Sequence, residues 1–390
     1  MVTYPKDWKE CRLNDLLAEK PQNGLTKPKA VRGNGVKMVG MGELFAQPHI
    51  TNVDMARVPV AKSEMKNYEL KMNDLLFARQ SLVLEGAGKC SIIADIKEPT
   101  VFESHLIRAR IDEDKADANF IFYWFNHTQG RNAILSLISR VAAAGVRSSE
   151  LVKIRIILPS SVYEQKAIAA TLSSFDTHID NLTALIEKKK AICDGALADL
   201  MSGRTRLAGF SGEWEETTLG KKIDVLRGKR LVRSQLSISS SGKFPVYQNS
   251  LLPLGYHEEF NCLPESVFVI AAGNAGDIGY SKTAFWAADD CYYFEHDDNI
   301  DQKFLCYNFL NRQAEIYTQT RRTSIPRLSR DILEKIKMRV PPLAEQKSIA
   351  DLLTSIDAEI QNIETERDKM QAIRAGAMDD LLTGRVRLPM

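Results

Sequence analysis

The 390-residue sequence lacks the features that mark several large classes of protein. Its six cysteines form no CxxC pair and have no regular spacing, which indicates reduced thiols rather than a disulfide framework. No apolar run approaches the roughly 18 residues that a membrane span needs, and the opening residues MVTYPKDWKE do not resemble a signal peptide. We therefore expect a soluble, cytoplasmic protein that has no membrane partner.

The chain also lacks an excess of charge of either sign. It carries 52 lysines plus arginines and 50 aspartates plus glutamates, which leaves a formal net charge of +2. A polyanionic partner can therefore be indicated only by local clusters of basic residues. The hydrophobic share of 44% is ample for folded cores, and the length predicts two or three domains.

Catalytic motifs are missing as well. The sequence contains no GxxxxGK[ST] phosphate loop, no Asn-Pro-Pro-aromatic segment, no HExxH and no GxSxG. One acidic segment around Cys291 and His296 could be imagined as a metal site, but a solvated acidic loop is the preferred interpretation. Its carboxylates belong to Asp289, Asp290, Asp297 and Asp298. We expect a non-catalytic chain that binds no metal.

The sequence does contain an internal repeat. Residues 164–207, which begin EQKAIAATLSSFD and end SGRTRL, recur without a gap at 345–388, and 21 of the 44 aligned positions are identical. A shorter echo, Trp-x4-Leu, begins at Trp8 and again at Trp214. The order domain, helix, domain, helix predicts a pseudo-two-fold internal repeat. Such a frame suits a molecule that holds two similar heads against a target with two halves.

The repeated segments have the hydrophobic period of long helices. Apolar residues recur at alternating spacings of four and three, which predicts a coiled-coil seam. A helix of about 40 residues extends roughly 60 Å, so we expect the two helices to pack on each other. Lys189, Arg367 and Arg374 interrupt the seams, either as solvated stems in an imperfect heptad or as positions that face other subunits or carry pairing information. The predicted seam residues are Ile168, Leu172, Phe175, Ile179, Leu182, Ile186, Ile349, Leu353, Ile356, Ile360, Ile363 and Met370.

The repeats divide the chain into two globular domains and two long helices. Short β-like runs and single apolar helices at about 118–139 and 301–317 predict mixed α/β domains and an α+β fold class. Between the landmarks the domains share little sequence, which predicts a shared frame around different interiors. The predicted boundaries are 1–158 for the first domain, 159–207 for the first helix, 208–340 for the second domain and 341–390 for the second helix.

Basic and amide side chains cluster in the loops of both domains. Lysine and arginine neutralise phosphates, and arginine, asparagine and glutamine can make two hydrogen bonds to one base edge. Any single one of these residues can simply be solvated, but together they predict DNA contact. The candidates in the first domain are Arg32, Asn34, Lys37, Arg79, Gln80, Lys89, Arg147 and Ser148. Those in the second are Arg227, Lys229, Arg230, Gln248, Asn249, Ser250, Asn274, Lys282, Arg321, Arg322 and Arg327.

The arrangement resembles the DNA-specificity subunit of a type I restriction–modification system over almost the whole chain. The resemblance rests on EQKAIAATLSSFDTHID and EQKSIADLLTSIDAEI after proline-ended strands, on the endings DGALADLMSGRTRL and AGAMDDLLTGRVRL, and on the Trp-x4-Leu openings. It implies two target recognition domains that each read one half of an asymmetric bipartite DNA site. It also implies that the long helices form an antiparallel coiled coil that spaces the domains.

The resemblance further implies partners. Two methyltransferase subunits are expected to dock on the helices and to supply S-adenosylmethionine and adenine methylation, and restriction subunits that use ATP and Mg would complete a nuclease. This chain is expected to bind double-stranded DNA and no cofactor. A second interpretation is an interaction scaffold whose duplicated coiled-coil arms hold other proteins, which would not need basic and amide loops. A third, an enzyme acting alone, is disfavoured by the missing motifs.

Overall fold

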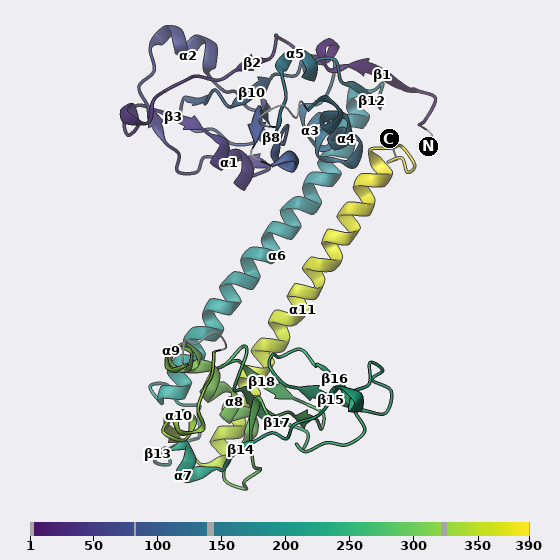
Figure 1. Cartoon of the computed structure of the whole chain (residues 1–390). Helices are drawn as coiled ribbons and strands as arrows, with labels where there is room; N and C mark the ends of the chain where they lie inside the picture. Colours follow the sequence, from purple (N-terminus) through teal and green to yellow (C-terminus); the bar gives the residue numbers. More distant parts are fainter. Residues whose placement is uncertain (1–3, 82, 139–143, 321–325, 390) are drawn as a thin grey trace. The chain divides into compact units, whose positions relative to one another are not determined.

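The computed structural model describes residues 4–389 except 82, 139–143 and 321–325. The chain forms two compact units, unit 1 (residues 1–181 and 367–390) and unit 2 (residues 182–366). Two long helices, α6 (Val162–Ser202) and α11 (Leu343–Leu381), each contribute one stretch to unit 1 and another to unit 2 (Figure 1). Both ends of the chain lie in unit 1, where Arg387 forms a 2.9 Å ion pair with Asp7. Segments near the two ends of the chain are therefore adjacent.

Unit 1 is built on a five-stranded sheet with the order β2-β10-β6-β8-β4. Its central strands are buried along their whole length because apolar residues cover both faces. A three-stranded sheet β5-β3-β9 adjoins it, and two short ladders pair β1 with β12 and β7 with β11. The strands are β1 Trp8–Arg12, β2 Gln22–Asn23, β3 Val36–Val39, β4 His49–Ile50, β5 Arg57–Val58, β6 Leu75–Ala78, β7 Gln80–Ser81, β8 Cys90–Ile93, β9 Thr100–Phe102, β10 Leu106–Ala109, β11 Ala144–Gly145 and β12 Arg155–Pro159. The short helices are α1 Met41–Ala46, α2 Lys62–Tyr68, α3 Ala118–Asn126, α4 Thr128–Leu137 and α5 Ser148–Leu151.

Unit 2 has a four-stranded sheet with the order β14-β20-β17-β18, a three-stranded sheet β16-β15-β19 and a ladder of β13 with β21. Residues of β17 are buried throughout, as in the central strands of unit 1. The strands are β13 Glu215–Thr218, β14 Val225–Arg227, β15 Phe244–Tyr247, β16 Gly255–His257, β17 Ser266–Ile270, β18 Ile278–Ser281, β19 Trp286–Ala287, β20 Cys291–Phe294 and β21 Lys337–Val340. The short helices are α7 Leu219–Lys222, α8 Gln302–Asn311, α9 Gln313–Gln319 and α10 Arg330–Glu334.

The two units share their strand order, which corrects the expectation of different interiors. In chain order, β2, β6, β8 and β10 of unit 1 correspond to β14, β17, β18 and β20 of unit 2. The parallel pair β3 with β9 corresponds to the parallel pair β15 with β19. A strand that is buried on both faces needs apolar residues but no particular ones. The divergence therefore lies in sequence and loops, and the topology is common.

Each of the two predicted apolar helices is two helices in the structure. The first breaks at His127, between α3 and α4, and the second at Arg312, between α8 and α9. After the first break the backbone passes close to the end of α3. A Cβ placed on Gly130 would lie only 2.2 Å from the carbonyl oxygen of Trp124, so a larger residue would clash there. Both leading helices start at an aspartate whose side chain caps the third helical N–H: Asp117 at 2.8 Å and Asp301 at 2.7 Å.

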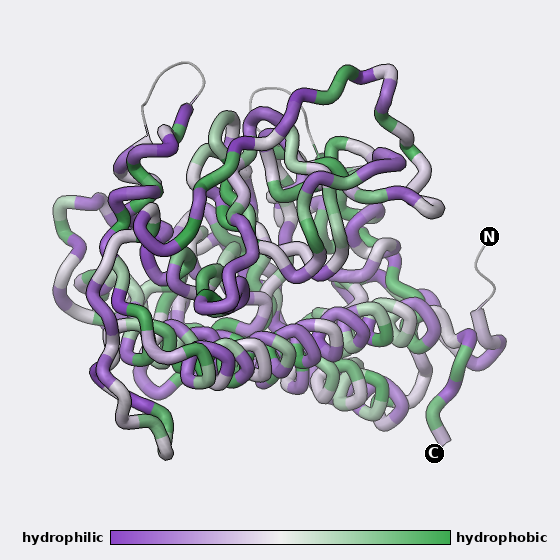
Figure 2. Tube along the Cα trace, turned by 90° about the horizontal axis from the view of Figure 1, so that it is seen from below, coloured by the Kyte–Doolittle hydropathy of each residue, from purple (hydrophilic) through white to green (hydrophobic). Residues whose placement is uncertain are grey.

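The predicted seam residues of α6 and α11 are all buried or half-buried. Figure 2 shows hydrophilic and hydrophobic residues alternating along both long helices. Both helices are followed, within three residues of their ends, by a glycine with positive φ, Gly203 at +69° and Gly384 at +72°, as a helix C-terminus commonly requires. The charged interruptions are paired within their units. Lys189 binds Glu359 at 2.7 Å, Arg374 binds Asp176, and Arg367 binds its neighbour Asp368 at 2.7 Å.

The repeated Glu-Gln sequence forms the same structure in both units, which we call the Glu-Gln clamp (Glu164-Gln165 in unit 1, Glu345-Gln346 in unit 2). The amide of Gln165 accepts the backbone N–H of Asp117 at 2.9 Å and donates to the Pro159 carbonyl at 2.8 Å. The amide of Gln346 accepts the N–H of Asp301 at 2.9 Å and donates to the Pro341 carbonyl at 2.8 Å. Each clamp thus joins the start of a long helix to the start of α3 or α8.

The glutamate of each clamp binds an arginine from the other copy of the repeat. In unit 1 Glu164 accepts Nη2 of Arg387 at 2.7 Å, and in unit 2 Glu345 accepts Nη2 of Arg206 at 2.6 Å. The first arginine follows α11 and the second follows α6, so within each unit the two long-helix segments run antiparallel. The two pairs occupy equivalent positions, because 387 minus 206 and 345 minus 164 both equal 181.

A second pair of contacts repeats in the same way. The hydroxyl of Tyr123 on α3 donates to Asp176 on α6 at 2.7 Å, and the hydroxyl of Tyr307 on α8 donates to Asp357 on α11 at 2.6 Å. Burial and the neighbouring carboxylate raise the pKa of both phenols, which therefore stay protonated donors. Each globular part is thus fixed to its own stretch of long helix by the same residue types.

Candidate nucleic-acid interface

Several loops of unit 2 meet at one end of its central sheet. The N–H of Asn274 donates to the carbonyl of Asn249 at 3.0 Å, and the N–H of Ala271 donates to that of Asp290 at 2.7 Å. The segment before α10 joins them, because Leu328 donates its N–H to the Ala271 carbonyl at 2.8 Å. We call this end the unit 2 loop edge. It consists of residues 227–230, 248–250, 271–277, 288–290 and 326–328.

Only glycine fits where the loops after β15 and β17 meet within this edge. Gly273 has φ +88°, and a Cβ placed on it would lie 2.8 Å from the Cβ of Asn249. The chain therefore brings the loop after β15 and the loop after β17 into backbone contact. This approach places the exposed side chains of Asn249 and Asn274 on neighbouring loops.

Most of the candidates predicted in the second domain lie on the unit 2 loop edge. Arg227 is exposed and its Nε donates to the Asp289 carbonyl at 2.8 Å. Lys229, Arg230 and Arg327 are exposed and form no salt bridge with another described residue. Their charges are thus available to an anion. The remaining members, half-buried or exposed on the same edge, are Gln248, Asn249, Ser250 and Asn274.

Unit 1 forms an equivalent edge from the same backbone contacts. The N–H of Arg79 donates to the His105 carbonyl at 2.8 Å, and the N–H of Val146 donates to the Arg79 carbonyl at 2.9 Å. These bonds match those of Ala271 with Asp290 and of Leu328 with Ala271, since Arg79 and Ala271 directly follow β6 and β17. We call residues 79–81, 87–89, 103–105 and 145–148 the unit 1 loop edge.

The unit 1 loop edge gathers five predicted candidates: Arg79, Gln80, Lys89, Arg147 and Ser148. The ammonium of Lys89 donates to the Phe45 carbonyl at 2.9 Å, and burial lowers its pKa. Arg32 reaches the same edge through a 3.6 Å ion pair with Glu103. The exposed His105 also lies here and was not predicted, because a single histidine has no sequence pattern.

Three predicted candidates lie elsewhere. Lys37 is buried, and its ammonium binds the Asn52 side chain at 2.9 Å, the Val53 carbonyl at 3.0 Å and Glu98 at 3.1 Å. It cannot reach a phosphate, and we remove it from the interface. Asn34 lies at the start of β3 beside β5, and Lys282 follows β18 at the opposite end of the unit 2 sheet. Arg321 and Arg322 fall outside the described residues.

The acidic segment does not assemble a metal site. The Cys291 thiol is buried and donates to the Gln248 carbonyl at 3.0 Å, whereas His296 pairs with Ser266 at 2.6 Å beyond the other end of β20. Among the described residues no group of three or more histidine, cysteine, aspartate or glutamate side chains could hold a metal ion. No helix in the described part of the chain is long and apolar enough to cross a membrane.

The geometry is that of two equivalent loop edges with different side chains on a duplicated frame. Residues 5–190 and 211–372 match the family model described as the type I restriction modification DNA specificity domain. The chain belongs to this family. The match covers both copies of the frame, so the resemblance predicted from the repeats and the Trp-x4-Leu openings is confirmed.

Related proteins match this chain over nearly its whole length or over part of it. A protein of Methanocaldococcus jannaschii named putative type I restriction enzyme MjaX specificity subunit is 24% identical over 98% of this chain and 95% of its own length. The type I restriction enzyme EcoKI specificity subunit of Escherichia coli is 22% identical over 57% of this chain and 46% of its own.

Solved structures share the fold. The crystal structure of the type I restriction–modification system S subunit from M. genitalium superposes with a TM-score of 0.68 at 20% identity, over 98% of this chain and 96% of that one. A chain from a study of complex assembly and conformational transition of the type I system gives a TM-score of 0.57 at 13% identity, over 99% of this chain and 100% of that one.

Proposed function

We propose that this chain is the DNA-reading specificity subunit of a type I restriction–modification complex. In this proposal residues 1–158 and 208–340 are two target recognition domains, and each reads one half of a bipartite site through its loop edge. The observation that carries it is the equivalence of the edges: the same backbone contacts in both units hold different exposed side chains. A common scaffold with different readers suits a target whose two halves differ.

The chemistry of the edges supports base reading as well as phosphate binding. Asn249, Asn274 and Arg327 on one edge and Arg79 and Gln80 on the other carry groups that can pair with a base edge through two hydrogen bonds. Lys229 and Arg230 supply charge for the backbone, and such contacts position a protein without reading sequence. Different readers on the two edges predict an asymmetric site.

The long helices supply spacing and docking in this proposal. Residues 159–207 and 341–390 would form an antiparallel coiled coil, and the cross-copy pairs of the clamps, Arg387 with Glu164 and Arg206 with Glu345, support that direction. Two methyltransferase subunits would dock on this frame and provide S-adenosylmethionine chemistry. Restriction subunits would use ATP and Mg. Related proteins are named as specificity subunits of type I restriction enzymes, which supports partnership with other restriction–modification subunits.

Single substitutions on one edge test the assignment of half-sites. Asn274→Ala is expected to relax recognition at one position of the unit 2 half-site by about 1–3 kcal/mol, a roughly 5- to 150-fold loss of discrimination. Gln80→Ala should do the same in the other half-site only. Lys282→Gln, at the far end of the unit 2 sheet, is the control. The readout is the binding affinity of the purified chain for a panel of duplexes with single base changes.

The same panel separates DNA reading from a protein scaffold. A DNA reader loses affinity steeply as salt rises, because each phosphate contact releases counterions. If the affinity for DNA depends neither on salt concentration nor on base sequence, the chain is better described as a protein scaffold.

A further inference from the structure

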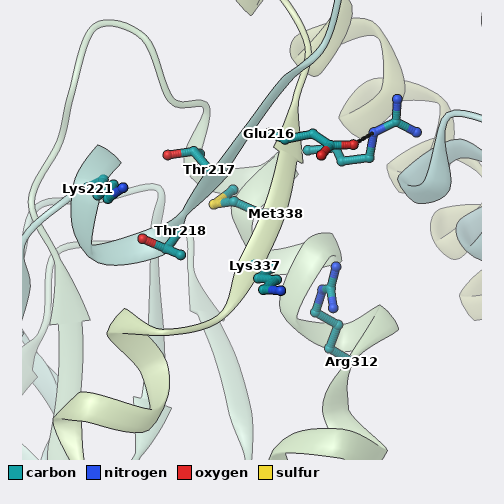
Figure 3. Close-up of a pocket in the computed structure, with 8 residues that line it drawn as sticks. Glu216, Thr217, Thr218, Lys221, Arg312, Lys337 and Met338 are labelled. Carbon is teal, nitrogen blue, oxygen red and sulfur yellow. Dashed lines mark ion pairs between the residues drawn. The ribbon is translucent and has the colours of Figure 1, made fainter.

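A pocket of about 430 Å³ lies in unit 2 away from the loop edge, against the ladder of β13 and β21. Figure 3 shows Lys221, Arg312 and Lys337 around it, from α7, from the break between α8 and α9, and from β21. The acid that lines it, Glu216, is paired with Arg339 at 3.4 Å. We call this pocket the basic groove. Its lining carries more positive than negative charge.

The donors of the basic groove are largely unused within the described residues. Lys221 and Lys337 form no ion pair there, and Nε of Arg312 is buried without a hydrogen-bond partner. Nη1 of Arg312 pairs with Glu315 at 3.4 Å, and this carboxylate is mostly exposed. Thr218 does not cap α7 with its side chain, which leaves a hydroxyl on the rim. Ammonium, guanidinium and hydroxyl donors that line one pocket with few acidic partners favour an anion with several oxygens.

Unit 1 carries less net positive charge at the equivalent places, although Arg12 stands there where unit 2 has Thr218. The last pair of the β1–β12 ladder holds Arg155 where unit 2 has Lys337, but Arg155 is paired with Glu10 at 2.7 Å. Asp15 stands where unit 2 has Lys221, three residues beyond the ladder. His127 stands at the helix break in place of Arg312, and it is buried against Asp379. The basic groove is therefore a property of unit 2 and not of the shared frame.

The groove extends along α9 toward the unit 2 loop edge. A neighbouring pocket shares Arg312 and Lys337 with it, adds Lys335, and follows α9 as far as Gln319. At that end of α9, Tyr317 donates to Asp277, which lies in the same loop as Asn274. A seven-residue helix is about 10 Å long, close to the roughly 12 Å width of the DNA major groove. A duplex read at the edge would thus place phosphates within reach of the groove.

We propose that the basic groove binds backbone phosphates of DNA beside the half-site read by unit 2. This inference rests on the proposed function and adds a contact to it that is independent of sequence and confined to one half of the site. It predicts that the two halves of the complex differ in salt dependence. Removing the groove's charge should weaken binding to every sequence alike.

The test is the double variant Lys221→Gln/Lys337→Gln in the full chain. Both side chains are exposed and form no ion pair with a described residue, so the fold should persist, and thermal unfolding checks this. The matched control, Lys282→Gln/Lys347→Gln, removes the same charge from a pocket of about 500 Å³ that also contains Asp297, Asp298, Asp301 and Asp351. Affinities for a specific duplex and a scrambled duplex are measured from 50 to 200 mM salt. A parallel titration with inorganic pyrophosphate tests a free phosphate ligand.

The groove variant should lower affinity for both duplexes by the same factor and leave their ratio unchanged. Each lost phosphate contact should reduce the slope of log affinity against log salt concentration by about 0.9. Across this fourfold range of salt the affinity would then fall about 3.5-fold less than that of the wild type. Ethylation of phosphates flanking the unit 2 half-site should interfere with wild-type binding and not with the variant. Unchanged slope and affinity, or a loss equal to that of the control, would overturn the proposal. Pyrophosphate binding that the variant loses without any effect on DNA would overturn it in favour of a free phosphate ligand.

Failure of the proposed function would look different. In that case the wild-type chain itself would not prefer the specific duplex, whatever the groove variant does.

Discussion

Gln346 allows the structural role of the repeated motif to be tested by itself. Its side chain is fully buried, and besides the bonds to Asp301 and Pro341 it donates to the Asn299 carbonyl at 2.9 Å. Gln346→Ala removes all three bonds. Asn299 is exposed, so water can replace the lost donor there. The Asp301 N–H and the Pro341 carbonyl would be left without partners in the interior.

The expected cost follows from those two groups. An unsatisfied buried polar group costs about 1–3 kcal/mol, and Asp301 is only half-buried, so we expect about 2–4 kcal/mol for the pair. At about 1.4 kcal/mol per tenfold, the open population of unit 2 around α8 should rise roughly 30- to 700-fold. The matched control is Gln361→Ala on the exposed face of the same helix, which should change stability by less than about 0.5 kcal/mol.

Hydrogen–deuterium exchange of peptides from α3 and α8 measures the effect in each unit. Gln346→Ala should lower protection at α8 and spare α3, and Gln165→Ala should do the reverse. If the amides of α8 are as well protected from exchange in the Gln346→Ala variant as in the Gln361→Ala variant, the clamp does not hold the domain to the helix.

The remaining predictions concern glycines, chain connectivity and helix length. Gly376→Ala on α11, where an added Cβ meets nothing within 4 Å, should stabilise by about 0.5–1 kcal/mol, whereas Gly130→Ala must clash with the Trp124 carbonyl and lower the melting temperature; equal shifts would contradict this. A circular permutant joined through residues 390 and 1 and opened at 208, beside the uncrowded Gly209, should bind DNA as the parent does, because Arg387 and Asp7 already pair; a folded permutant that has lost binding would refute it. Seven residues added to both α6 and α11, after 181 and after 366, lengthen each helix by about 10 Å, which is about three base pairs at 3.4 Å each. Both half-sites should then persist with a longer gap, and an unchanged gap would show that the helices do not set the spacing.

Periodicity predicted the long helices well and the shorter ones poorly. The four-three spacing extends over α6 and α11 apart from the charged interruptions at Lys189, Arg367 and Arg374, and both helices end before Gly203 and Gly384 as expected. The breaks at His127 and Arg312 fall in the short polar stretches NHTQGRN and NRQ, which the prediction of one continuous helix in each domain passed over. At the first break the backbone also approaches itself closely at Gly130, which the hydrophobic period does not show.

The sequence did not show which charged side chains are buried and which are exposed. Lys37 and Lys229 are both lysines near glycines, yet the first is buried with three partners and the second is exposed. The pairing of Arg206 with Glu345 joins residues 139 positions apart. Arg206 and Glu345 both lie in the repeated sequence, but the repeat does not show that a residue of one copy binds a residue of the other. The sequence predicted which residue types the loops carry but not that these loops meet at one end of each sheet, because the strand order brings them together.

The central claim is that this chain provides the DNA address of a methylating complex. The most direct measurement is to co-express it with its methyltransferase partner and to sequence the methylated DNA at base resolution, with and without this chain. The account predicts one asymmetric, bipartite motif that disappears when the chain is omitted. Methylation that persists unchanged without the chain, or that follows no bipartite motif with it, would contradict the account.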